Sequence, residues 1–248
     1  MTLLLQALGL GRSDVVAVAG AGGKTTLVYR LAGEARDAGL RVLVTSTTHM
    51  GTLPETITGP VVLEEEEGDL GTRLGKVMRE TGYATVLGRY VRPDKIEGLG
   101  APRVDELVSR ADLVVIEADG ARGRSLKVPA SHEPVIPRST TVLVVVAALD
   151  VLGQPLDDAR VHRLELVAAA TGKQAGQAVD EEAVVAALSH AEGYPARVAP
   201  GVRAAVFLNK AEDPGAWAAA ERIALRLIGT YPLVAAGSAR GGEVRVWR

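Results

Sequence analysis

The sequence predicts an α/β fold in which a mostly parallel sheet is flanked by helices, with a helical insertion after about residue 150. Short apolar runs rich in valine, such as VVAVA at residues 15–19, have the composition of strands buried on both faces. These runs alternate with longer segments of helical periodicity, an order that is typical of parallel sheets with right-handed crossovers. A glycine-rich stretch, GAGGKTT at residues 20–26, separates the first such strand from the first long helix.

In the first half of the chain, the start MTLLLQALGLGRSD is expected to form a short helix packed on the domain. A helix is predicted from about Lys24 to Ala38, because its apolar residues recur at helical spacing and Gly39 is a suitable stop. The other expected elements are a strand at 41–47, a short strand and acidic turn at 59–69, a helix at 70–80, a strand at 83–91, a helix at 101–110 and a strand at 111–120.

In the second half, residues 157–198 have a mainly helical pattern, in which Asp180 is expected to cap a helix. The other expected elements are strands at 140–149, at 203–210 and in YPLVAAGS, and a helix at 214–229. The length of 248 residues suits one α/β domain, and we expect a single nucleotide-binding domain, 1–248, in which 151–201 form the mainly helical insertion.

Composition narrows the class of protein. The formal net charge of −2 argues against a nucleic-acid-binding protein, which usually carries a basic stripe. The chain has no cysteine, which excludes disulfides, thiolate metal sites, thiol nucleophiles and a covalent selenium–sulfur adduct. No apolar run reaches the roughly 18 residues that a membrane span needs, and the start lacks the features of a signal peptide. We therefore expect a cytoplasmic protein that does not bind a membrane.

The stretch at residues 20–26 has the features of a phosphate-binding loop. Glycines let backbone N–H groups turn toward a phosphate, and the N-terminus of the following helix adds partial positive charge. The strict pattern GxxxxGK(S/T) would need glycine in place of Val18, but the shorter form GxxGK(S/T) fits, and the alternative is a turn with an incidental lysine. Lys24 is expected to reach the β- and γ-phosphates and Thr25 to ligate Mg²⁺, which makes the predicted fold phosphate-loop NTPase-like. The predicted cofactors are Mg²⁺ and ATP or GTP, held by Gly20, Ala21, Gly22, Gly23, Lys24, Thr25 and Thr26.

The stretch LVVIEADG ends a predicted buried strand with Glu117 and Asp119. In phosphate-loop enzymes an acid at such a strand end holds Mg²⁺ directly or through water. Because side chains alternate along a strand, both carboxylates are expected on one face. The prediction is that Thr25 and Asp119 hold the metal, and that Glu117 holds a nearby water or acts as base. The alternative is simple turn chemistry at Asp119 and Gly120.

Basic and polar residues follow that strand in GARGRSLKVPASHEPVIP, residues 120–137. At the carboxyl edge of a parallel sheet they could clamp phosphates or a second anionic substrate, although a surface loop with ordinary charges is the alternative. The candidates are Arg122, Arg124 and Glu133 for substrate binding, and Lys127 and His132 for catalysis.

Three shorter motifs supply further candidates. TSTTHM leaves the second strand with hydroxyls and a histidine, although threonine is also a good strand former, and VHR lies in the insertion, where a lone histidine is more often structural. LNKAED resembles the NKxD guanine reader of GTPases, with glutamate in the aspartate position, and the alternative is a cap at a strand end. The candidates are Thr47, Thr48, His49, His162 and Arg163 for substrate, and Asn209, Lys210 and Glu212 for the nucleobase.

Taken together and in this order, VAGAGGKTTL, TSTTHM, EADGARGRSLKVPASHEPVIP, VHRLEL and LNKAED resemble the YqeC family, described as selenium-dependent hydroxylase accessory proteins. The resemblance spans residues 15 to about 213, and its long central stretch is the specific part. It implies a cytoplasmic role in the maturation of molybdenum hydroxylases that carry selenium. The partners it implies are such a hydroxylase or a cofactor-processing protein.

Three functions are compatible with these motifs. The first is Mg²⁺-dependent NTP hydrolysis or phosphoryl transfer that drives an accessory step. The second is a nucleotide-gated chaperone or switch that docks a partner without significant turnover. The third is a ligase or kinase acting on a small anionic metabolite, which the short loop form and the basic segment suggest.

Overall fold

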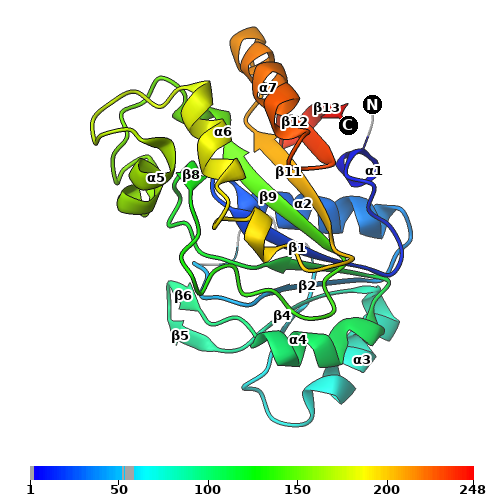
Figure 1. Cartoon of the computed structure of the whole chain (residues 1–248). Coiled ribbons are helices and arrows are strands. Elements are labelled where there is room, and N and C mark those ends of the chain that lie inside the picture. Colours follow the sequence, from blue (N-terminus) through cyan, green and yellow to red (C-terminus); the bar gives the residue numbers. More distant parts are fainter. Residues whose placement is uncertain (1–2, 52, 54–58) are drawn as a thin grey trace.

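The computed structural model describes residues 3–51, 53 and 59–248, and its centre is a nine-stranded sheet with helices on both faces (Figure 1). The strand order is β13-β12-β11-β9-β1-β7-β2-β4-β3, and all neighbours are parallel except β12 and β13. The strands are β1 (Asp14–Gly20), β2 (Val42–Ser46), β3 (Val61–Leu63), β4 (Tyr83–Leu87), β7 (Leu113–Glu117), β9 (Val142–Ala148), β11 (Arg203–Asn209), β12 (Leu233–Ser238) and β13 (Gly241–Trp247). The predicted α/β class with a mostly parallel sheet is confirmed.

The helices cover the sheet as its alternating side chains require. Val16 and Val18 of β1 face the helices α1 and α2, whereas Ala17 and Ala19 face the opposite layer, which contains α6 and α7. The helices α3 and α4 pack on the other half of the sheet, over β2, β4 and β7. The helices are α1 (Leu4–Ala7), α2 (Lys24–Asp37), α3 (Leu70–Thr81), α4 (Ala101–Leu107), α5 (Leu164–Thr171), α6 (Glu181–Ser189) and α7 (Pro214–Leu227).

Two small sheets lie outside the main one. The antiparallel pair β5 (Tyr90–Arg92) and β6 (Lys95–Ile96) forms a hairpin, and the parallel pair β8 (Leu126–Lys127) and β10 (Val161–His162) joins the segment after β7 to the insertion. The single strand predicted at 83–91 is wrong in this respect, because the chain breaks between β4 and β5. At the break, the amide of Gly88 donates to the carbonyl of Glu97 instead of continuing the ladder of β4.

The insertion after residue 150 contains α5 and α6, as predicted, but turns and β10 occupy much of 157–198, so that segment is less helical than its composition indicates. The carboxylate of Asp180 accepts from the amide of Ala183 at 2.9 Å, which confirms the predicted N-cap of α6. The edge strand β13 was not predicted, although the alternation in EVRVW is a strand pattern. Within the described residues, no helix is long and apolar enough to cross a membrane.

Candidate functional site

The glycine-rich loop lies between the end of β1 and the start of α2, and its backbone requires glycine. Gly20, Gly22 and Gly23 have φ angles of 101°, 84° and 114°, a region that side chains disfavour. A Cβ atom on Gly20 would also lie 2.2 Å from the carbonyl oxygen of Val146, and one on Gly22 would lie 2.3 Å from the Cβ of Ala148. The loop therefore packs closely against the end of β9 and leads directly into α2, and this strand–loop–helix unit confirms the phosphate-loop NTPase-like fold.

The side chain of Lys24 is folded back into the loop. It is 5% exposed, its Nζ donates to the carbonyl of Gly20 at 2.7 Å, and it lies 3.3 Å from the Oδ1 of Asp119. A lysine at this position of a phosphate loop is held near the place where phosphate oxygens would bind. In this structure, its counter-charge is the carboxylate of Asp119.

Asp119 is the centre of a buried ionic network. Its carboxylate is inaccessible to solvent, accepts from the amide of Gly20 at 3.1 and 3.2 Å, and lies 2.9 Å from the Nζ of Lys127. The hydroxyl of Tyr194 donates to the same carboxylate at 3.3 Å, and burial together with the Asp119 charge raises the pKa of that phenol. Two lysines, one amide and one phenol thus surround Asp119.

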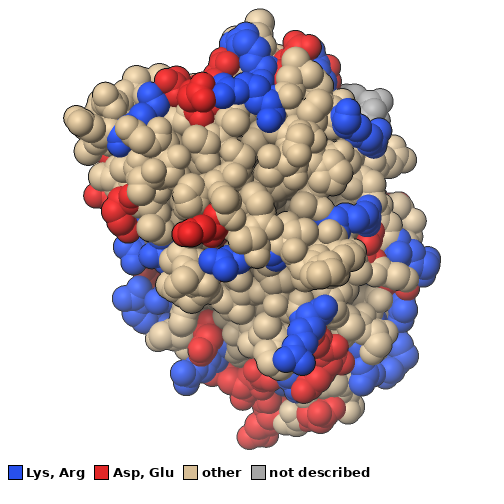
Figure 2. All heavy atoms as spheres, viewed as in Figure 1, with Lys and Arg blue, Asp and Glu red and all other residues tan. Residues whose placement is uncertain are grey.

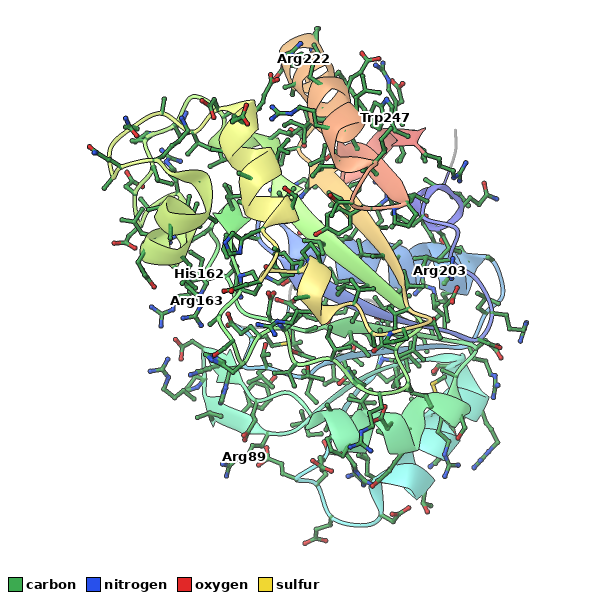
Figure 3. All side chains as sticks on the ribbon, in the orientation of Figure 1. Arg89, His162, Arg163, Arg203, Arg222 and Trp247 are labelled. Carbon is green, nitrogen blue, oxygen red and sulfur yellow. The ribbon has the colours of Figure 1, made fainter. Side chains whose placement is uncertain are left out.

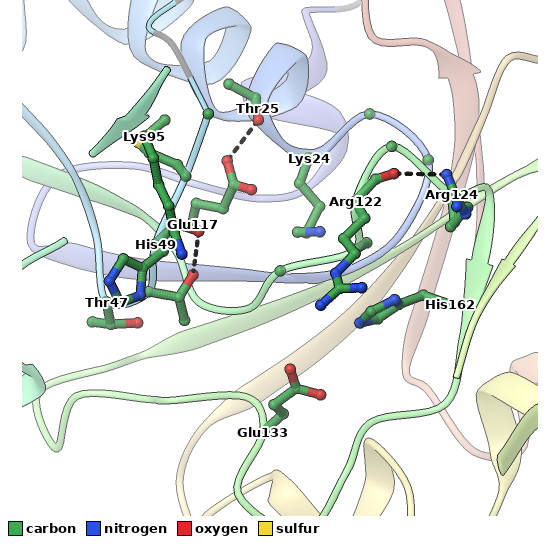
Figure 4. Close-up of a pocket in the computed structure, with 18 of the residues that line it drawn as sticks. Lys24, Thr25, Thr47, His49, Lys95, Glu117, Arg122, Arg124, Glu133 and His162 are labelled. Carbon is green, nitrogen blue, oxygen red and sulfur yellow. Dashed lines mark hydrogen bonds between the residues drawn. The ribbon is translucent and has the colours of Figure 1, made fainter. Parts of the chain in front are cut away.

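Thr25 contacts a different acid. Its hydroxyl donates to the Oε2 of Glu117 at 2.7 Å, at the carboxyl end of β7, the strand beside β1 (Figure 4). Burial raises the pKa of Glu117, and the charge of Lys24 and the hydrogen bond from Thr25 act against that shift. The sequence predicted Thr25 and Asp119 as the metal pair, but the structure brings Thr25 to Glu117, because Asp119 turns toward the two lysines.

The Thr25–Glu117 pair has the donor chemistry that Mg²⁺ prefers, a hydroxyl and a carboxylate oxygen. Within the described part of the chain, no group of three or more Asp, Glu or His side chains gathers as a metal site. A Mg²⁺ ion here would therefore take its remaining ligands from water and phosphate oxygens, as is usual for this metal.

The buried network continues away from the loop through Glu133. Its carboxylate lies 3.0 Å from the Nζ of Lys127 and accepts from the Nε of Arg163 at 3.0 Å. Burial opposes ionisation of Glu133, but the Arg163 hydrogen bond and the Lys127 charge outweigh it and hold its pKa at about 2. Lys127 is 1% exposed and also donates to the carbonyl of Gly120, so it lies beneath the cavity wall and does not line the cavity.

A cavity of about 1090 Å³ opens in front of the loop. It brings together all eight residues that the sequence singled out for substrate binding, which come from segments far apart in the chain. Figure 3 places His162 and Arg163 side by side, on the side where Figure 2 shows basic side chains at the left edge of the molecule. The predicted residues that line it are Thr47, Thr48, His49, Arg122, Arg124, His132, Glu133, His162 and Arg163, together with Gly22, Gly23, Lys24, Thr25, Thr26 and Glu117.

Sequence reasoning missed three residues of the cavity wall, Arg92, Asp94 and Lys95, which come from the β5–β6 hairpin. The signal that could have found them is the Pro93–Asp94 pair between basic residues, a composition typical of a tight turn.

Thr47 lines the cavity and also makes structural hydrogen bonds. Its amide donates to the carbonyl of Glu117, and its hydroxyl donates to the carbonyl of Val135.

A second cavity of about 430 Å³ lies on the other side of the loop, where β11 ends. Asn209 is buried there and its side-chain amide donates to the carbonyl of Gly22 at 2.6 Å. Lys210, Glu212 and Arg240 also line this cavity. The Nζ of Lys210 pairs with Asp150 at 2.5 Å, and Glu212 accepts from the hydroxyl of Ser238 at 2.7 Å. The three candidates for nucleobase contact therefore adjoin the phosphate loop.

Comparison with known proteins supports the resemblance that the motifs and their order indicated. The family of the YqeC protein matches residues 16–165, and a relative from Escherichia coli (strain K12), described as "Uncharacterized protein YqeC", is 33% identical over 201 residues. That alignment covers 80% of this chain and 77% of the relative. The chain belongs to the YqeC family. The matched region contains the phosphate loop, Glu117, Asp119 and the stretch 120–137, which are the parts of the site on which the resemblance rested.

Two solved structures resemble this YqeC chain in outline. Chloroplast FtsY from Physcomitrella patens has a TM-score of 0.45 and 16% identity, with all of this chain and 66% of that chain covered. A DUF1611 family protein from Anabaena variabilis has a TM-score of 0.37 and 17% identity, with 95% of this chain and 55% of that chain covered.

Proposed function

We propose that this YqeC family protein binds a Mg²⁺–nucleoside triphosphate at residues 20–26 and hydrolyses it or transfers its terminal phosphoryl group. The observation that supports this most directly is the loop itself, in which three glycines at positive φ admit no side chain and lead directly into the N-terminus of α2, whose partial positive charge favours a phosphate. Lys24 at the first position of that helix and the Thr25–Glu117 pair beside it add a cation and a metal-binding set. The site is proposed to assist the maturation of selenium-dependent molybdenum hydroxylases, as the family implies.

In the proposed reaction, Lys24 leaves Asp119 and binds the β- and γ-phosphates, where its charge stabilises the transferring group. Thr25 and Glu117 would hold the Mg²⁺ ion, which supplies further charge stabilisation when it is bound. Asp119 then keeps Lys127 and the amide of Gly20, and so holds the loop in shape. His132 lines the cavity and is the proposed proton carrier on the acceptor side.

The nucleoside is proposed to bind in the smaller cavity, against Asn209, Lys210 and Glu212. A carboxylate at Glu212 accepts hydrogen bonds from a guanine edge, whereas the hydroxyl of Ser238 and the side chain of Arg240 could serve adenine or guanine. ATP and GTP are therefore both retained as candidate ligands. The proposed partner is a molybdenum hydroxylase or a cofactor-processing protein in the cytoplasm, not a nucleic acid or a membrane.

The decisive experiment is a calorimetric titration of the whole chain with Mg-ATP and with Mg-GTP. The wild type is expected to bind at least one of them, Lys24→Ala to lose that binding, and Lys76→Ala, an exposed lysine on α3, to keep it. Phosphate release should follow the same order. Absence of binding by both nucleotides, or equal binding by Lys24→Ala and the wild type, would overturn the proposal.

A second candidate function, a nucleotide-gated switch, is favoured by one connection. Lys127, which contacts Asp119, lies on β8, and β8 pairs with β10, which leads into α5 of the insertion. A shift of Lys24 on nucleotide binding would therefore be transmitted through β8 and β10 to α5 of the insertion. This function predicts that a hydroxylase or cofactor-processing protein is captured by the chain more strongly with nucleotide than without it. Equal capture under both conditions counts against it.

A further inference from the structure

We infer that the larger cavity holds two anionic groups at once, the nucleotide phosphates at the glycine loop and a separate phosphate-bearing small molecule bound by Arg122 on the facing wall. This inference rests on the proposed function and adds to it a second ligand site with its own residues. Three observations support it: the division of the space around the loop, the charge of the wall, and the backbone conformation of the arginines.

The space around the loop is divided in a way that leaves room for a second ligand. Gly22, Gly23, Thr26 and Gly123 line both cavities, so the smaller and the larger one meet at the loop. Thr25 and Glu117, which would hold the Mg²⁺ ion that neutralises charge on the terminal phosphates, line the larger cavity and not the smaller one. The terminal phosphate would therefore point into the larger cavity, whose volume of about 1090 Å³ matches a whole small-molecule site and exceeds what a phosphate tail fills.

The wall of this cavity carries positive side chains other than Lys24, the cation of the proposed nucleotide site. Among the described residues that line it, six are Lys or Arg, three are Asp or Glu and three are His. Arg163 is paired with Glu133, and Arg92 with Asp94. Arg122 and Lys95 have no hydrogen bond or ion pair from their side chains to another described residue. Such unpaired cations lower the free energy of a bound anion, and a guanidinium fits a phosphate with two parallel hydrogen bonds.

The backbone at the arginines is strained. Arg122 and Arg163 have φ angles of 49° and 64°, in the left-handed region that residues with a Cβ avoid. Lys210, beside the smaller cavity, has the third such angle, and Ser13 is the only other non-glycine residue of this kind in the part of the chain that the structure describes. Strain of this kind clusters at functional sites.

The turn at Arg122 is held by its neighbours. Arg124 donates to the carbonyl of Arg122 at 3.1 Å and also to the carbonyl of Asp158, so it anchors the segment to the insertion. The Arg122 guanidinium points into the cavity, on the side of His162 and toward Lys24 (Figure 4). A glycine at this position would be free of strain, yet the chain has an arginine there, with glycine one residue later at φ 73°.

The test measures whether a second anion binds while the nucleotide stays bound. The protein is saturated with Mg²⁺ and a non-hydrolysable triphosphate that carries a fluorescent ribose label, and inorganic pyrophosphate is then titrated calorimetrically. The label reports any displacement of the nucleotide. The variants are Arg122→Asn, since asparagine tolerates a positive φ, and Arg122→Lys, which keeps the charge. The control is Arg89→Asn, an exposed arginine outside the cavity that pairs with Glu97 (Figure 3).

We expect one equivalent of pyrophosphate to bind without release of the label. Arg122→Asn should weaken its affinity by about tenfold or more, Arg122→Lys by less, and Arg89→Asn should leave it unchanged. The loss in Arg122→Asn should be larger for pyrophosphate than for the nucleotide.

Pyrophosphate that binds only by displacing the label, or that binds equally to the wild type and Arg122→Asn, overturns the inference and leaves the proposed function intact. Failure of the labelled nucleotide itself to bind overturns both. The two failures are therefore distinguishable in one experiment.

Discussion

Replacement of Asp119 by asparagine tests the assignment of this residue directly. In the structure, the Asp119 carboxylate lies 3.3 Å from the ammonium of Lys24 and 2.9 Å from that of Lys127, with no exposure to solvent. An asparagine keeps the shape and can still accept from the amide of Gly20, but it removes the negative charge between two buried cations. Asp119→Asn therefore isolates the ionic contribution from the packing.

The expected loss of stability depends on which contacts the two lysines keep in the variant. Removal of one partner from a buried ion pair costs about 3–5 kcal/mol, because a charge is left buried and uncompensated. Lys127 would still have Glu133 at 3.0 Å, and Lys24 would still donate to the carbonyl of Gly20 at 2.7 Å. We therefore expect a loss near the lower end, about 3 kcal/mol in the free energy of unfolding. For a chain of this size, that corresponds to a Tm about 6–12 °C lower.

The assay is urea unfolding at neutral pH without nucleotide or Mg²⁺. The matched control is Asp94→Asn, which breaks the exposed pair with Arg92 and should change the stability by about 0–1 kcal/mol. A loss for Asp119→Asn no larger than that of the control would refute the argument. If such a variant instead lost Mg²⁺-dependent nucleotide binding, the metal pair would be Thr25 and Asp119, as the sequence alone predicted.

Three further outcomes follow from the site. Because the pKa of Glu133 is held at about 2, below its usual 4.5, its contribution of up to about 3 kcal/mol is present above pH 4.5 and fades as pH falls toward 2. The stability difference between wild type and Glu133→Gln should therefore shrink between pH 6 and pH 3 in chemical denaturation. Glu117→Gln should abolish the Mg²⁺ dependence of nucleotide affinity in calorimetry, whereas Glu97→Gln, at an exposed ion pair, should keep it. Glu212→Gln should reduce the preference for GTP over ATP by about tenfold if guanine is the base, and an unchanged ratio would exclude Glu212 from base contact.

The phosphate loop could be predicted from the sequence because its geometry is local. Gly20, Gly22 and Gly23 are required by positive φ angles and by close contacts with β9 and β11, and a strand and a helix flank them in the chain. The burial of β1 and β7 also follows from composition, since both are continuous apolar runs. These features need no knowledge of contacts between distant residues.

The choice between Glu117 and Asp119 could not be predicted in the same way. The two carboxylates are two residues apart at one strand end, so alternation places them on the same side. Their different surroundings come from Lys127 on the two-residue strand β8 and from Tyr194 in the insertion, 75 residues further along the chain. Neither β8 nor the position of Tyr194 has a signal in the local sequence.

The part of the larger cavity that the β5–β6 hairpin lines could not be predicted from the sequence for a related reason. Arg92 and Lys95 reach it only because the chain breaks after β4 and forms a hairpin, and that break depends on a hydrogen bond from Gly88 to Glu97. The pattern of 83–91 is compatible with one continuous strand, so the charges of the hairpin were assigned no role.

The buried network gives the two ligand sites a physical connection. A phosphate at the loop competes with Asp119 for Lys24. From Asp119 the network continues through three ion pairs, Asp119–Lys127 at 2.9 Å, Lys127–Glu133 at 3.0 Å and Glu133–Arg163 at 3.0 Å. Loss of Lys24 from Asp119 leaves that carboxylate more dependent on Lys127, which weakens the contact of Lys127 with Glu133 and makes Glu133 more dependent on Arg163. Because coupling between two binding equilibria is reciprocal, an anion that draws Arg163 away from Glu133 must in turn disfavour nucleotide binding by the same factor. The ionic chain thus predicts negative cooperativity between the nucleotide and an anion that binds Arg163, and replacement of Glu133 by glutamine should remove this coupling without removing either site.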